Sequence, residues 1–139
     1  MKRNHPRFAV LAGIALAAAC APVAADSCKD AKFKVTNNHA EGREIEIRKV
    51  RYFNPHTGTT QTEDVQNLIC RHGATCTTAG DKLTNAKNID LNSIQVVFAF
   101  RERDDDWSGE FQTRPFVPTF RKCVEGKVYG PIVVSDNGG

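Results

Sequence analysis

The stretch that decides the fold runs from Ile94 to Phe100 and reads IQVVFAF. Alternate residues of this stretch form one apolar face: Ile94, Val96, Phe98 and Phe100. Val97 and Ala99 make the opposite face apolar as well. A strand that is apolar on both faces is typical of a central strand that is covered on both sides. The sequence therefore predicts a β-sheet protein built around this strand.

Two stretches upstream of the central strand also predict strands. In residues 32–36 and 44–48, apolar side chains alternate with charged ones, as in strands with one buried face. The alternation changes phase after residue 48, because the next apolar residues are Val50 and Tyr52. One extra residue in the strand would restore the pattern, so we predict a β-bulge at residues 48–49.

The region between these strands and the central strand follows no strand pattern. Residues 60–70 begin with the capping-box sequence TQTE, and Val65, Leu68 and Ile69 share one face of a helix. We therefore predict one or two helical turns there. Residues 71–92 are polar and rich in Gly, Asn and Thr, which predicts a long irregular connection.

Further short strands follow the central strand. Residues 110–113 predict a strand, and two flanking prolines confine residues 116–117 to an edge or an irregular segment. Residues 120–129 read as a hairpin with a turn at Glu125 and Gly126. The fold class we expect is all-β: an antiparallel β-sandwich of about six to eight short strands, with at most one or two short helical turns, stapled by disulfides.

The N-terminus predicts an export signal. A basic start is followed by an apolar run over residues 8–19, and its 12 residues are too few to span a membrane. Small residues then lead to a cleavage position after Ala25. We expect a signal peptide over residues 1–25 and a single β-sandwich domain over residues 26–139, secreted or periplasmic in a bacterium, with no transmembrane segment.

Cys20 leaves an alternative to this cleavage open. The sequence AAAC over residues 17–20 resembles the lipidation site of a bacterial lipoprotein, although Ala17 stands where Leu is usual. Lipidation at Cys20 would make the protein an outer-membrane lipoprotein with a lipid anchor. Either processing leaves the same four later cysteines available for pairing.

Four cysteines in an exported chain predict two disulfides. Cys70 and Cys76 close a short loop, and Cys28 and Cys123 then tie the start of the domain to a late strand. The spacing ranks this pairing first among the three possible ones. Zinc binding by Cys70, Cys76 and His72 is disfavoured, because the two cysteines are too far apart in sequence and an oxidising compartment removes thiolates.

Charge excludes one class of partner. The chain has 19 Lys and Arg against 16 Asp and Glu. Lys2, Arg3 and Arg7 lie in the expected signal peptide, which has no acidic residue, so residues 26–139 hold 16 side chains of each sign. A neutral domain without aromatic residues between its basic ones is not typical of nucleic-acid binding. We expect no nucleic-acid partner.

The charged stretch after the central strand is the candidate binding surface. Its acidic side chains are Glu102, Asp104, Asp105 and Asp106. They lack the alternating order of a calcium loop, so we predict a solvated hairpin tip. Trp107 follows them; a Trp at a loop tip is typical of protein or sugar binding, whereas the only Trp of a β domain is often in the core.

Histidines add one candidate to this surface. His39, His56 and His72 are each expected in a solvated turn, with no spacing that suggests a metal site. His72 is singled out because the predicted disulfide loop would hold it rigid.

No enzyme motif occurs, and no cofactor or metal is expected. We expect a non-catalytic binding module for another protein or a glycan or cell-surface polymer. The candidate binding residues are Asp104, Asp105, Asp106, Trp107 and His72. Two alternatives stay open: a small secreted metal-dependent protein or enzyme that uses His72 and the acidic run of residues 102–106, and a membrane-active, pore-forming sandwich protein.

Overall fold

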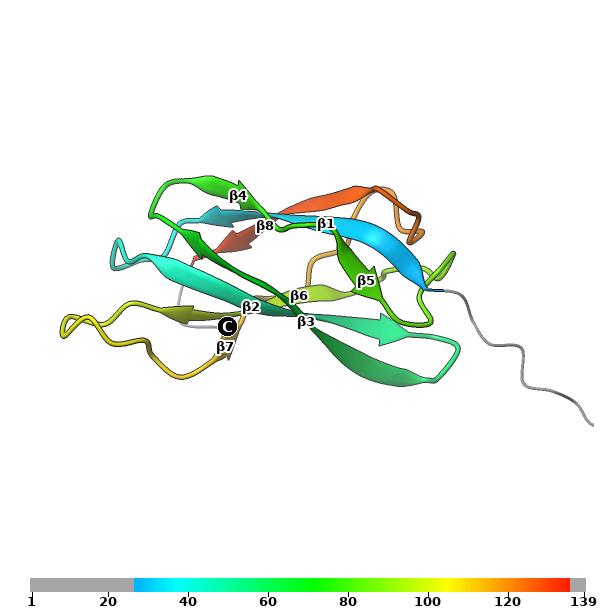
Figure 1. Cartoon of the computed structure of the whole chain (residues 1–139), viewed down its shortest axis with the longest axis horizontal. Coiled ribbons are helices and arrows are strands. Elements are labelled where there is room, and N and C mark those ends of the chain that lie inside the picture. Colours follow the sequence, from blue (N-terminus) through cyan, green and yellow to red (C-terminus); the bar gives the residue numbers. More distant parts are fainter. Residues whose placement is uncertain (1–26, 136–139) are drawn as a thin grey trace, which may run out of the picture.

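Two β-sheets face each other in this protein (Figure 1). The computed structural model describes residues 27–135, and no helix occurs among them. In chain order the strands are β1 (Cys28–Asn37), β2 (Ile45–Asn54), β3 (Thr59–Cys70), β4 (Thr75–Thr77), β5 (Asp81–Leu83), β6 (Ile94–Phe100), β7 (Phe111–Gln112) and β8 (Val128–Val134). The predicted all-β sandwich is confirmed.

The first sheet is built around β1. β4 and β5 pair with successive parts of one edge of β1, and β8 pairs with the other edge. The second sheet has the order β3-β2-β6-β7. Pairing is antiparallel throughout, except that β8 runs parallel to β1. The core lies between the two layers, where Phe33 and Tyr129 of the first sheet and Tyr52 and Phe98 of the second are almost wholly buried.

The central strand is β6, which pairs with β2 on one side and with the short β7 on the other. Its predicted burial on both faces is confirmed, because Val97 and Ala99 are buried as well as the core-facing residues. Their partners across the sheet are Lys49 and Glu46. The long charged side chains on this outer face, joined by a 2.9 Å contact between Lys49 and Glu110, keep it from being open to solvent.

The predicted bulge is also confirmed. Ile47 pairs with Phe98, but Lys49 pairs with Val97, so Arg48 is an extra residue on β2. The apolar residues on both sides of the bulge therefore reach the same core.

The predicted helical turns at residues 60–70 are wrong, because β3 occupies this segment. The same irregularity explains the helix-like spacing. Asp64 pairs with Lys49 and Leu68 pairs with Ile47, so three residues of β3 bulge between these pairs. Val65 is buried and Leu68 packs against the core although they are three residues apart, and Ile69 points to solvent.

The predicted hairpin at residues 120–129 is also wrong. The turn is present, with Gly126 in the left-handed region. Residues 121–123, however, pair with residues 88–91 and not with β8. The amide of Cys123 donates to the carbonyl of Ile89 at 2.9 Å, and Leu91 donates to Arg121 at 2.7 Å. This leaves β8 free to pair with β1.

The connection at residues 71–92 is less irregular than expected, because it contains β4 and β5. Both predicted disulfides are confirmed: Cys28 is bonded to Cys123 and Cys70 to Cys76. The expected signal peptide and the candidate lipid anchor at Cys20 lie outside the described residues.

Candidate functional site

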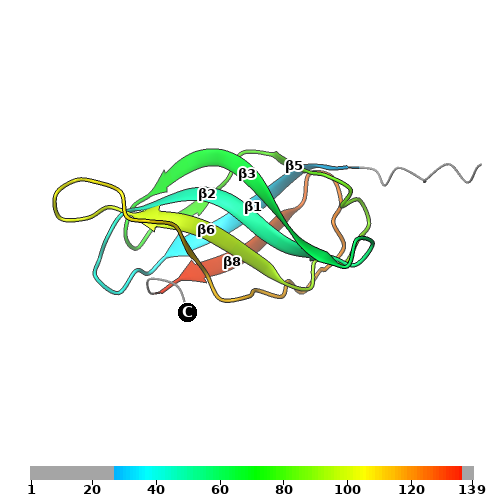
Figure 2. The same cartoon turned by 90° about the horizontal axis from the view of Figure 1, so that it is seen from below.

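Three connections come together at one end of the sandwich, which we call the loop end. They are residues 38–44 between β1 and β2, residues 71–74 between β3 and β4, and residues 101–110 between β6 and β7. Figures 1 and 2 show all three on the left. Loops gather there because the strands before them all run toward this end. A rigid sandwich that presents loops at one end is a common platform for binding.

Buried Asn37 joins the first connection to the end of β3, directly before the second connection. Its Nδ2 donates to the carbonyl oxygens of Arg43 at 2.8 Å and Cys70 at 2.9 Å. Its Oδ1 accepts from the amide of His39 at 3.0 Å. The disulfide between Cys70 and Cys76 adds a covalent restraint to the same place. Hydrogen bonds and a disulfide therefore restrain the loop end against the two sheets.

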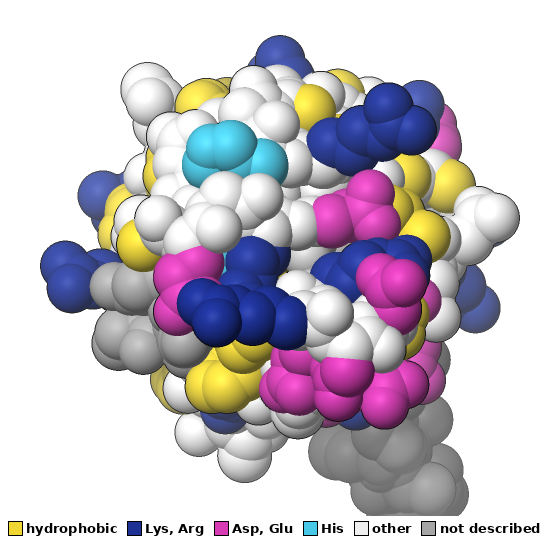
Figure 3. All heavy atoms as spheres, turned by 90° about the vertical axis from the view of Figure 1, so that its left-hand side faces the viewer, with side chains coloured by type: hydrophobic (Ala, Val, Ile, Leu, Met, Phe, Trp, Pro, Cys, Tyr) yellow, Lys and Arg dark blue, Asp and Glu magenta, His cyan; other side chains and the backbone are white. Residues whose placement is uncertain are grey.

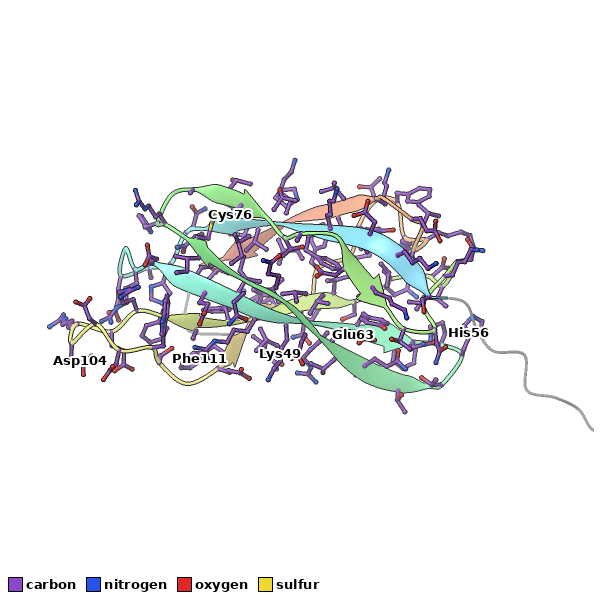
Figure 4. All side chains as sticks on the ribbon, viewed as in Figure 1. Lys49, His56, Glu63, Cys76, Asp104 and Phe111 are labelled. Carbon is purple, nitrogen blue, oxygen red and sulfur yellow. A yellow bond between two sulfur atoms is a disulfide. The ribbon has the colours of Figure 1, made fainter. Side chains whose placement is uncertain are left out.

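His39 contradicts the expectation of a solvated turn histidine. Only 1% of the residue is exposed, and its ring lies 5.0 Å from the ring of Phe100. Its Nδ1 accepts from the amide of Glu41 at 3.3 Å. His39 is thus part of the packing beneath the loop end, whereas His56 fits the expectation, since it is exposed in the turn at the opposite end (Figure 4).

Arg43 links the first connection to the third. Its Nε donates to Oε2 of Glu41 at 2.8 Å, Nη2 donates to the same oxygen, and Nη1 donates to the carbonyl of Arg101 at 3.1 Å. The guanidinium lies 5.1 Å from the ring centre of Phe100. Arg43 lowers the pKa of the Glu41 carboxyl by its hydrogen bond and its charge, and the charge of Arg103 lowers it further.

The predicted solvated hairpin tip is present in the third connection. An antiparallel bridge joins Arg101 and Trp107, and the amide of Glu102 donates to the carbonyl of Asp106 at 2.7 Å. Asp104 lies at the projecting tip (Figure 4). The exposed acidic residues of this tip are Glu102, Asp104, Asp105 and Asp106.

Trp107 is neither a core residue nor a free platform. It is half-buried, and the guanidinium of Arg101 lies 4.8 Å from its ring centre. Arg101 also contacts Glu44 at 3.1 Å and Asp105 at 3.8 Å. One face of the indole ring is therefore already covered by a cation within the protein.

Two adjoining hollows of about 320 and 460 Å³ lie at the loop end. They share Arg43, Glu102 and Arg103 as lining residues. The smaller one adds Glu41 and Arg101, and the larger one adds Phe100 and Asp104. Figure 3 looks onto this end and shows basic side chains across its middle, with acidic side chains on both sides of them and the densest acidic group below.

The arginines of these hollows are site residues that the sequence reasoning missed. Arg43 precedes an alternating strand, and Arg101 and Arg103 lie in a mixed charge run, so each had an ordinary explanation as a surface charge. No spacing signal connects residues 43 and 103. Only the packing of the β1–β2 connection against the end of β6 brings them together.

His72 is exposed in the loop closed by the Cys70–Cys76 disulfide, at the same end of the sandwich as the acidic tip. Within residues 27–135, no group of three or more His, Cys, Asp and Glu side chains is arranged to hold a metal ion. The described part of the chain therefore offers no geometric support for the metal-dependent alternative.

A further hollow of about 320 Å³ lies at the opposite end of the sandwich. Its lining residues are Ser27, Lys29, Lys82, Lys87 and Glu125. It shares no residue with the loop end and therefore supplies matched control positions.

The fold and the site define a disulfide-stapled β-sandwich protein with a charged, preorganised loop end. No family model, curated protein or solved structure matches the chain. Among residues 27–135 there is no helix of the length and apolar character needed to cross a membrane.

Proposed function

We propose that this protein is an exported, non-catalytic binding module of the bacterial envelope, and that its loop end contacts another protein. The observation that carries the proposal is the convergence of three connections whose backbones are fixed from below. Asn37, the Cys70–Cys76 disulfide and Arg43 restrain them, while charged side chains remain exposed above. Such preorganisation lowers the entropy that is lost on binding.

Export and the absence of catalysis have separate support. Two disulfides fit an oxidising compartment. They also occupy all four cysteines of residues 27–135, so no thiol nucleophile is left in that part of the chain. Ser108 is the serine nearest the hollows in sequence. Its hydroxyl accepts from the amide of Phe100 and donates to the carbonyl of Gly109, so its proton is already held by the backbone.

A protein partner is favoured over a glycan by the state of Trp107. Sugar-binding aromatic residues offer an exposed ring, but Trp107 is half-buried and Arg101 covers one of the two faces of its indole. Arg and Trp in mixed-charge surroundings are typical of protein interfaces. The candidate binding residues expected from the sequence, Asp104, Asp105, Asp106, Trp107 and His72, stay part of the proposed surface.

The proposal is tested by capture of partners from the envelope of the producing organism. The bait is tethered before Cys28, because β1 begins at the end opposite the loop end (Figure 1). A protein retained by the wild type and by Lys82→Ala, but lost with the double variant Asp105→Ala/Trp107→Ala, supports the proposal. The captured protein is then purified and its binding to the same variants measured.

Equal capture by all variants contradicts the proposed surface. Binding of the wild type to envelope polysaccharide, with no protein retained, would replace the protein partner by a glycan. Circular dichroism of each variant establishes that the fold is unchanged.

A further inference from the structure

We propose that Arg103 and Arg43 hold a carboxylate of the partner protein, from an Asp or Glu side chain that is flanked by basic residues. This inference rests on the proposed function and specifies the chemistry that the loop end recognises. It begins with the larger hollow, whose volume is about 460 Å³ and whose lining includes both arginines.

Arg43 is fixed in orientation but not saturated. Glu41 accepts from its Nε and Nη2, and the carbonyl of Arg101 accepts from its Nη1. A guanidinium has five N–H donors, so about two remain for a ligand. The ring of Phe100 lies against the guanidinium and supports its plane. A planar, oriented guanidinium is suited to bidentate recognition of a carboxylate.

Arg103 supplies the second positive charge. Arg103 is exposed and forms no ion pair within residues 27–135. Arg43 and Arg101, by contrast, are both paired with carboxylates. Its charge acts in the same region, since it helps to lower the pKa of the Glu41 carboxyl. An incoming carboxylate therefore gains a contact with Arg103 without first displacing a carboxylate of the described chain.

The acidic residues of the site select the ligand further. Glu102 and Asp104 line the same hollow, and Asp105 is 88% exposed beside it. They would repel a doubly charged phosphate more strongly than a singly charged carboxylate. They would also repel a run of acidic residues but attract Lys or Arg next to the bound carboxylate. The mixed charges of the loop end (Figure 3) are thus complementary to a mixed-charge peptide segment.

The test uses two peptides that differ in one charge, acetyl-Lys-Glu-Lys-amide and acetyl-Lys-Gln-Lys-amide. Binding to the whole protein is followed by NMR through the arginine Nε–Hε signals, up to about 10 mM peptide, because isolated contacts of this kind are weak. The Glu peptide should shift the signals of Arg43 and Arg103 and bind about fivefold more tightly than the Gln peptide. Arg103→Gln should weaken this preference, because only Arg43 then remains to hold the carboxylate. Lys82→Gln, which removes one positive charge at the opposite end, should keep it.

Equal binding of both peptides, or an unchanged preference in Arg103→Gln, overturns the inference. Binding of an oligogalacturonate in place of the Glu peptide also overturns it, because the ligand would then be an acidic polysaccharide. Failure here is distinguishable from failure of the proposed function. If Arg103→Gln still captures a partner that Asp105→Ala/Trp107→Ala loses, the loop end binds but the carboxylate contact is wrong.

Discussion

The two disulfides should stabilise the fold to different extents, and the difference follows from the loops that they close. Cys28 and Cys123 are separated by 95 positions, and Cys70 and Cys76 by six. In the chain-entropy description, restriction of the unfolded chain contributes about 4.7 kcal/mol for the long loop and about 2.3 kcal/mol for the short one. Replacing Cys28 and Cys123 by Ala should therefore cost about 2.4 kcal/mol more than replacing Cys70 and Cys76.

Urea unfolding of the two double-alanine variants and the wild type, followed by the fluorescence of Trp107, measures this difference. Cys28, Cys123 and Cys70 are buried and Cys76 is half-buried, so both variants lose packing and this loss partly cancels in the comparison. A Cys70→Ala/Cys76→Ala variant that is as unstable as the other, or more so, would refute the reasoning from loop length.

The same pair of variants also separates stability from the site. Amide hydrogen exchange in residues 71–75 should rise in Cys70→Ala/Cys76→Ala, because the short loop loses its covalent restraint. In Cys28→Ala/Cys123→Ala, exchange should rise throughout the domain, because the global free energy of unfolding falls.

Three further predictions concern single residues. Asn37→Ala should lower the free energy of unfolding by about 3 kcal/mol in urea titrations, because it removes three buried or part-buried hydrogen bonds of the Asn37 side chain. Gly130→Ala should cost about 2–4 kcal/mol, since a methyl group would collide with backbone, whereas Gly42→Ala, with open space around it, should cost about 1 kcal/mol. Burial, and then the charge of Glu63, raise the pKa of Tyr52 above its ordinary 10.0. In the unfolded chain, Tyr52 therefore loses its hydroxyl proton at a lower pH than in the folded protein, so the free energy of unfolding should fall as pH rises past 10.0. Glu63→Gln removes part of the pKa shift, so in that variant the fall should end at a lower pH. A stability that stays level up to about pH 12 would contradict this.

Much of the fold could be predicted from the local alternation of apolar and polar residues. The two apolar faces of residues 94–100 predicted the central strand, and the phase change after residue 48 located the bulge. The prediction of a helix at residues 60–70 was wrong because of the bulge in β3. This three-residue bulge places Val65 and Leu68, which are three residues apart, on the core side, as a helix would. Periodicity alone does not separate these two causes.

The candidate site could be predicted from the sequence only in part. Its acidic tip and Trp107 lie in one contiguous run, so the sequence indicated them as a surface. Arg43 and Arg103 are 60 positions apart, and neither has a local signal that tells it from an ordinary surface charge. His39 was misjudged because its burial depends on Phe100, which another strand supplies.

The sequence by itself determined the all-β class, the bulge on β2 and the pairing of the four cysteines, because side-chain alternation and loop spacing act over a few residues or through covalent bonds. Tertiary structure decided that residues 59–70 form a strand, that β8 runs beside β1, and that three arginines meet at one end of the sandwich. Those outcomes depend on which distant segments satisfy the backbone hydrogen bonds and cover the apolar faces, and that choice is made by the whole chain.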